Sequence, residues 1–207
     1  HATDVGGKLL RKAFDPDIVA IKDFLPDRPG LEVYYVVESS VHAGVYLADA
    51  STGKILWKIN REDDPRWTHG HVGWAADIWK GSPGLECYAN RDGHAVRDPL
   101  LLSAFGRILL EPFPAGLVPV EWDGDSVREL LARDGKSIGK FNGREVVPLP
   151  GMSPNETGRG SVIMVADLVG DFRDEIVVAG PDLEGNFSVS IYTPTFLIRN
   201  RAVTRTA

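Results

Sequence analysis

Two histidines stand two residues apart in the segment 67–74, which reads WTHGHVGW. In an extended strand His69 and His71 would project to one face, because successive side chains alternate between the two faces. Gly70 and Gly73 would let the backbone approach a ligand closely. Paired imidazoles could ligate a metal, transfer a proton or hold a hydroxyl group of a ligand. We take both histidines as candidate catalytic residues, and solvated loop histidines are the alternative interpretation.

Trp67 opens the same segment, shortly after the acidic run 62–64. The other tryptophans lie mostly in apolar runs, which is typical of core residues. An aromatic ring among charged residues can stay at the surface and stack on a sugar ring. We therefore predict that Trp67 is exposed and binds substrate.

Two acidic turns place oxygen ligands at alternate positions around a glycine. The first, EWDGD at 121–125, precedes Glu129, and the second, DLVGD at 167–171, precedes Asp174 and Glu175. Calcium binds ~6 to 8 oxygens, and such spacing can surround one ion. The predicted ligands of calcium, or of another divalent cation, are Asp123, Asp125, Glu129, Asp167, Asp171 and Asp174. The alternative is an Asx-type turn whose carboxylates accept backbone hydrogen bonds.

The polar loop 153–161, SPNETGRGS, surrounds one arginine with small residues. The planar guanidinium of Arg159 suits bidentate capture of a carboxylate. Asn155 and Thr157, in the same loop, are candidate substrate-binding residues. A polar connection without a ligand is the alternative interpretation.

One pattern recurs four times and must position these groups: an apolar run, a turn, then a glutamate that leads into a second apolar run. The glutamates follow one another in steps of 54, 43 and 46 residues, at Glu32, Glu86, Glu129 and Glu175. Periods of ~40 to 50 residues built from short strands are typical of β-propeller blades. We predict an all-β propeller segment over residues 1–207, with about four blades, in repeats near 18–59, 72–113, 117–147 and 161–200. Because a partial ring would expose strand edges, we expect a companion segment of the same propeller or self-association.

Composition excludes several classes of protein. The 207 residues are 43% hydrophobic and 25% charged, with 22 Gly and 14 Pro, which suits a loop-rich globular β protein. A net charge of −6 argues against a nucleic-acid partner, whose phosphates require a basic face. No apolar run reaches the ~18 residues that a membrane span needs. The single cysteine, Cys87, excludes an internal disulfide and is expected to be buried, and both chain ends are expected to be cuts through a larger protein.

Three phrases resemble the rhamnogalacturonan lyases of polysaccharide lyase family eleven. DRPGLEVYYVVES at 27–39 is similar to that family's DPxxPGLEVF, and ADASTGKILWKI at 48–59 is similar to its DAxTGxxLW. VADLVGDFRDEIV at 165–177 is similar to VADxxGDWREEV and is the most specific match. Two of these phrases lie in the first repeat and one in the fourth. It implies the C-terminal part of an eight-bladed propeller.

The resemblance also implies a secreted or periplasmic enzyme that acts on an acidic, uronate-containing polysaccharide. Its reaction would be a metal-assisted β-elimination at galacturonate, with calcium as cofactor. Arg159 stands where the family has a lysine thought to act in catalysis. Arginine stays protonated, so it could hold the uronate but is a poor base, which leaves the activity open. The alternative is a non-catalytic calcium-loop propeller that binds glycan or protein.

Overall fold

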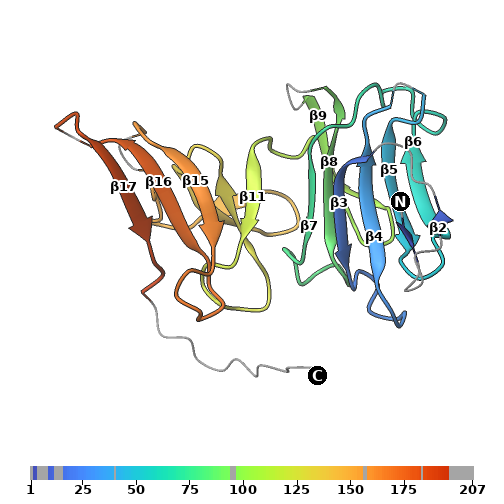
Figure 1. Cartoon of the computed structure of the whole chain (residues 1–207), viewed down its shortest axis with the longest axis horizontal. Coiled ribbons are helices and arrows are strands. Elements are labelled where there is room, and N and C mark those ends of the chain that lie inside the picture. The colour runs from blue at the N-terminus through green and yellow to red at the C-terminus, as the bar shows by residue number, and fades with distance from the viewer. Residues whose placement is uncertain are drawn as a thin grey trace. The chain divides into compact units, whose positions relative to one another are not determined.

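The computed structural model describes residues 2–3, 9–11, 16–39, 41–93, 97–155, 158–182 and 184–195. Within these ranges every regular element is a β-strand, so the all-β prediction is confirmed (Figure 1). No helix in these ranges is long and apolar enough to cross a bilayer. The chain divides into two compact units, 1–115 and 116–207.

The first unit contains a two-stranded sheet and two four-stranded antiparallel sheets. In each of the larger sheets the strands pair in the order in which they follow one another along the chain, so each is a simple meander. The small sheet is β1 (Ala2–Thr3) and β2 (Leu9–Arg11). The first large sheet is β3 (Pro16–Lys22), β4 (Glu32–Val37), β5 (Gly44–Asp49) and β6 (Ile55–Asn60). The second is β7 (Gly73–Ala76), β8 (Glu86–Asp92), β9 (Arg97–Leu102) and β10 (Ile108–Leu110).

The second unit contains two further antiparallel meanders. The four-stranded sheet is β11 (Leu117–Val120), β12 (Glu129–Ala132), β13 (Ile138–Phe141) and β14 (Val146–Pro148). The three-stranded sheet is β15 (Ser161–Ala166), β16 (Glu175–Pro181) and β17 (Phe187–Tyr192). Four larger antiparallel sheets thus follow one another along the chain, one for each sequence repeat. The closure of such sheets into a propeller stays a prediction.

Each repeated glutamate begins the second strand of its sheet and is buried. Its Oε2 accepts a hydrogen bond from the backbone N–H of the second residue after the first strand. The pairs are Glu32 with Phe24 at 2.9 Å, Glu86 with Ile78 at 2.9 Å, Glu129 with Trp122 at 3.0 Å, and Glu175 with Leu168 at 2.7 Å. A hydrogen bond to a charged group contributes about 1.5–3 kcal/mol. The repeat in the sequence is therefore a repeated anchor that closes the first hairpin of each sheet.

The hairpin that joins β5 to β6 turns at residues 50–53, where the sequence pattern predicts it. The Oδ1 of Asp49 accepts hydrogen bonds from the N–H and the hydroxyl group of Thr52, at 2.7 and 2.8 Å. Gly53 adopts a φ of 69°, a left-handed conformation that favours glycine. The turn is therefore encoded by its own residues.

The core of the first unit lies between its two large sheets. Strand β7 contacts β3 and β4, and buried side chains from both sheets form one cluster. Cys87, on β8, is fully buried in this cluster, as the sequence predicts. In the second unit, Val120 and Leu131 of one sheet pack with Ile176 and Val178 of the other.

Candidate functional site

His69 and His71 lie side by side, each paired with a carboxylate. Their ring centroids are 5.9 Å apart with an interplanar angle of 29°, so the prediction that both project to one face is confirmed. The Nε2 of His69 lies 2.8 Å from Glu38 Oε1, and the Nδ1 of His71 lies in direct contact with Asp17 Oδ2. We call these four residues the histidine–carboxylate cluster. All four side chains are about one-third exposed, so solvent and ligands can reach them.

Backbone hydrogen bonds hold the histidine segment against the end of β8. The N–H of His69 donates to the carbonyl of Arg91 at 3.1 Å, and the carbonyl of His69 accepts from Gly93 N–H at 2.8 Å. The N–H of His71 donates to Asn90 Oδ1 at 3.1 Å. At Gly70 a Cβ would lie 2.8 Å from Val36 Cγ1, so the segment packs directly on β4. The imidazoles are thus presented from a fixed backbone.

This arrangement suits proton transfer, because a carboxylate paired with one ring nitrogen orients the imidazole. Glu38, His69 and His71 also bring one donor atom each to within 4.8 Å of one another, so they could share a divalent cation. Sequence reasoning missed Glu38 and Asp17. They belong to the first repeat, and only the packing of β7 against β3 and β4 brings them to the histidines.

Trp67 is fully buried, so the prediction that it is exposed is wrong. Its ring packs in the core cluster of the first unit, and the guanidinium carbon of Arg91 lies 5.9 Å from the ring centroid. Of the acidic residues before it, Asp64 pairs with Arg66 and Arg91, Glu62 pairs with Lys58, and Asp63 accepts a hydrogen bond from Asn60 N–H. A Cβ at Gly70 would lie 3.3 Å from Trp67 Cζ3, so the buried ring packs against the histidine segment.

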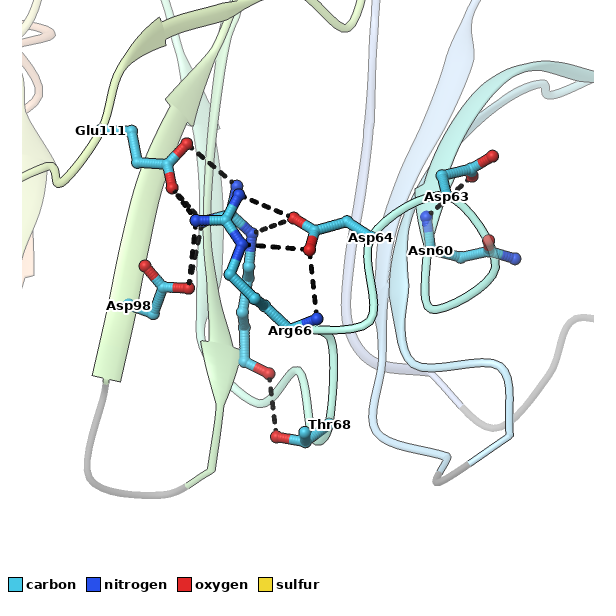
Figure 2. Close-up of polar contacts among 8 residues, drawn as sticks. Asn60, Asp63, Asp64, Arg66, Thr68, Asp98 and Glu111 are labelled. Atoms are coloured by element: carbon cyan, nitrogen blue, oxygen red, sulfur yellow. Dashed lines mark hydrogen bonds and ion pairs between the residues drawn. The ribbon is translucent and has the colours of Figure 1, made fainter.

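A network of charged side chains surrounds Arg91, which is fully buried (Figure 2). Its Nη1 and Nη2 donate to Glu111 Oε1 and Oε2, at 2.8 and 3.1 Å. Its Nε lies 3.1 Å from Asp64 Oδ2, and Nη1 lies 3.2 Å from Asp98 Oδ2. Figure 2 shows that Asp64, Arg66 and Glu111 converge, and Arg66 forms ion pairs with both carboxylates. The network joins β8, β9 and the turn before Trp67, and it fixes the path of the chain into the histidine segment.

The first acidic turn brings its predicted ligands together around a lysine. Asp123, Asp125 and Glu129 each place one oxygen within 4.8 Å of the others. The Nζ of Lys140 lies 2.6 Å from Asp123 Oδ2, 2.7 Å from Asp125 Oδ2 and 3.0 Å from Glu129 Oε1. A calcium ion and this ammonium group cannot both occupy the space among these oxygens. The turn as it is built therefore does not fit calcium.

Electrostatics at this turn favour the ion pairs. Burial alone would lower the pKa of Lys140, but its hydrogen bonds to Asp123, Asp125 and Glu129 outweigh it, so the pKa lies above its ordinary value. Burial raises the pKa of Glu129, and the bond from Lys140 opposes that rise. Lys140 therefore stays charged near neutral pH.

The second acidic turn is an Asx-type turn. Asp167 accepts hydrogen bonds from the backbone N–H groups of Gly170, Asp171 and Phe172, at 2.6, 3.1 and 2.8 Å. Asp171 pairs with Arg173. Asp174 turns toward the neighbouring sheet, where its Oδ2 accepts from Glu121 N–H at 2.7 Å. Among the described residues, Asp167, Asp171 and Asp174 do not bring their oxygens close enough together to share one metal ion.

The polar loop before β15 separates its candidate residues. Asn155 is buried, and its Nδ2 donates to the carbonyls of Asp134 and Gly160, at 2.7 and 2.8 Å. Both N–H groups of this amide thus bind the protein's own backbone. Arg159 is exposed, with Nη1 3.4 Å from the carbonyl of Asp182. Thr157 lies outside the described residues.

Meandering sheets anchored by buried glutamates, together with a partly exposed pair of histidines, define a repeat-built β protein that could act on a ligand at strand ends. The chain belongs to the rhamnogalacturonan lyases of family 11: the model described as "Rhamnogalacturonan lyase family 11, C-terminal domain" matches residues 3–206. The resemblance noted in its repeats is thereby confirmed.

Two curated relatives come from Bacillus subtilis (strain 168). The chain is 34% identical over 195 residues to rhamnogalacturonan endolyase YesW, and the aligned region covers 91% of this chain and 28% of the relative. It is 31% identical over 200 residues to rhamnogalacturonan exolyase YesX, and the aligned region covers 89% of this chain and 31% of the relative. The chain thus spans about three-tenths of the length of these relatives. The solved structure of the Vibrio cholerae biofilm matrix protein Bap1 covers 90% of this chain and 32% of its own, at 12% identity and a TM-score of 0.43, a likeness too weak to define the fold.

Proposed function

We propose that this chain forms part of a rhamnogalacturonan lyase that cleaves its polymer by β-elimination at galacturonate. The observation that carries the proposal is the histidine–carboxylate cluster, in a chain that belongs to this lyase family. The side chains of the cluster are about one-third exposed. Asp17 comes from β3, Glu38 follows β4, and the two histidines stand on the fixed backbone before β7. We propose a β-propeller, completed by further segments, as its framework.

In this reaction a base removes the proton on C5 of galacturonate, the bond from C4 to the glycosidic oxygen breaks, and a C4–C5 double bond forms. His71, oriented by Asp17, is the proposed base, because a neutral imidazole can accept a proton near neutral pH. His69, oriented by Glu38, is proposed to donate a proton to the departing oxygen. Arg159, a separate candidate in the second unit, is proposed to hold a uronate carboxylate through its guanidinium.

Calcium or another divalent cation stays the proposed cofactor. When bound, such an ion would neutralise the uronate carboxylate and make the C5 proton more acidic. No step is assigned to the first acidic turn, because Lys140 lies among its oxygens. Because the proposed substrate is a polymer too large to enter a cell intact, we propose a secreted or periplasmic location.

The test compares His71→Gln and His69→Gln with His42→Gln, a change at a histidine outside the cluster. With the protein at its natural length and rhamnogalacturonan oligosaccharides, formation of the new double bond is followed by its absorbance. Loss of general acid or base catalysis costs ~10²–10⁴-fold in rate, so we expect at least a 100-fold fall in kcat for both cluster variants and none for the control. Unchanged rates in cluster variants that keep the wild-type melting temperature would refute the proposed roles.

A second candidate is a non-catalytic propeller that binds glycan or protein. The exposed guanidinium of Arg159 favours it, because arginine can hold a carboxylate but is a poor base. In this case the wild-type protein would yield no unsaturated product, and Arg159→Ala would weaken oligosaccharide binding measured by calorimetry. Turnover by the wild-type protein would exclude this candidate.

A further inference from the structure

The first acidic turn holds a lysine ammonium where its spacing predicts a divalent cation. We propose that Lys140 is the resident cation of this turn, so that the turn is metal-independent and a divalent cation can enter only when the ammonium is removed. The proposal concerns the second unit and does not depend on lyase activity.

Both oxygens of Asp123, of Asp125 and of Glu129 have a partner. One oxygen of each carboxylate accepts from backbone N–H groups: Asp123 Oδ1 from Asp125 at 3.0 Å, Asp125 Oδ1 from Val127 at 2.7 Å, and Glu129 Oε2 from Trp122 and Asp123 at 3.0 and 3.2 Å. The other oxygen of each faces Lys140 Nζ, at 2.6, 2.7 and 3.0 Å. An ammonium group has three N–H donors. One donor for each carboxylate therefore saturates both the lysine and the turn.

The pairing of β13 with both of its neighbours places Lys140 beside the carboxylates. Lys140 lies within β13, where it pairs with Val147 of β14. Neighbouring residues Ile138 and Gly139 pair with Leu131 and Leu130 of β12, the strand that Glu129 begins. The pairing on both sides fixes the backbone of Lys140 relative to Glu129. Its side chain is 29% exposed and that of Glu129 only 1%, so the ion pairs are largely withdrawn from solvent screening.

In the first sheet the corresponding glutamate, Glu32, also faces a side-chain cation. The Nε of Arg28 lies 3.3 Å from Glu32 Oε1, while Glu32 Oε2 accepts from Phe24 N–H. Arg28 comes from the turn and Lys140 from the third strand of its sheet, yet both cations lie at the Oε1 side of the repeated glutamate. Two sheets thus neutralise this glutamate with the protein's own cations.

The test measures calcium binding by equilibrium dialysis and thermal unfolding with and without calcium, using the full 207-residue chain. We expect Asp125→Asn to leave the number of calcium ions bound by the wild type unchanged. Lys140→Met should lower the melting temperature in EDTA and bind one more calcium ion than the wild type, with a calcium-dependent rise in melting temperature. The extra site should disappear in the double variant Lys140→Met with Asp125→Asn. Lys136→Met, at an exposed lysine of the same unit, is the matched control and should gain no site.

A calcium site in the wild type that Asp125→Asn abolishes would overturn the proposal, as would a Lys140→Met variant that folds and gains no site. A second measurement applies even if Lys140→Met does not fold. In the wild type, acetylation of lysines by acetic anhydride is followed by mass spectrometry. Lys140 should react at least 10-fold more slowly than Lys136, and calcium should not change this ratio. Acceleration of Lys140 acetylation by calcium would show that the ion displaces the ammonium, against the proposal.

Discussion

The guanidinium of Arg91 and the carboxylate of Glu111 form two hydrogen bonds, at 2.8 and 3.1 Å, although Arg91 is fully buried. A planar fork of this kind matches a carboxylate in both charge and shape. The backbone carbonyl of Arg91 accepts a hydrogen bond from the N–H of His69. The Arg91–Glu111 pair therefore connects the buried charge network to the candidate site. The network is thus part of the support of that site.

Arg91→Met is expected to destabilise the chain by about 3–5 kcal/mol, because it leaves the carboxylates of Glu111 and Asp64 without their buried partner. Urea unfolding followed by tryptophan fluorescence measures the change. Arg97→Met is the matched control, since Arg97 is 72% exposed and lies 3.8 Å from Asp92. Exposed pairs contribute about 0–1 kcal/mol. Equal effects of the two changes would contradict the network's role.

Glu86→Gln is expected to change how stability depends on pH. Burial raises the pKa of Glu86 to about 7 in the folded chain, above its ordinary value of 4.5. Between these values the folded state binds a proton that the unfolded state lacks, so wild-type stability falls as pH rises through this window. Glutamine carries no charge, so the variant should match the wild type near pH 5 and exceed it by roughly 2–3 kcal/mol at pH 8.

Urea unfolding at both pH values measures this difference. Glu145→Gln, at an exposed glutamate, is the control and should keep the wild-type slope. A Glu86→Gln variant that keeps the wild-type slope would show that another group titrates.

Gly84→Ala is expected to be much more harmful than Gly30→Ala, although both glycines stand in Pro-Gly turns of the repeat. Both have positive φ, 84° and 113°, which costs a side chain about 1–2 kcal/mol. At Gly84 a Cβ would also lie 2.7 Å from Ala104 Cβ and overlap the carbonyl oxygen of Phe24, whereas at Gly30 nothing lies within 4 Å. Overpacking adds about 1–3 kcal/mol. Melting temperatures of the two variants measure the difference, and equal values would contradict it.

Asn155→Ala is expected to lower stability by about 2 kcal/mol, because it removes the two hydrogen bonds that the buried Asn155 amide donates to the carbonyls of Asp134 and Gly160. Arg159→Ala should leave stability unchanged, because Arg159 is exposed. Chemical unfolding of both variants tests this division of the loop into a structural and a ligand-facing residue. An Asn155→Ala variant of wild-type stability would return Asn155 to the substrate-binding candidates.

The repeats made the strands predictable, because each glutamate marks the start of a central strand and each glycine turn is local. The pairing of His69 with His71 was predictable for the same reason, since alternation along an extended segment needs only neighbours. The burial of Trp67 was not predictable, because it depends on core side chains of other strands and on Arg91, which lies further along the chain. Lys140 was missed because spacing identifies the carboxylates of a turn but not the strand that later crosses it. Glu38 and Asp17 join the histidines only through contacts between sheets.

The burial of Cys87 makes this thiol a natural probe of local unfolding. It is the only cysteine in the sequence, it lies on β8 within the core, and burial raises the pKa of its thiol well above its ordinary value. Reagents such as maleimides attack the thiolate, so modification must wait until the second sheet opens. The rate of labelling therefore measures how often β8 opens, and β8 also carries Asn90 and Arg91, which hold the histidine segment. No engineered probe is needed.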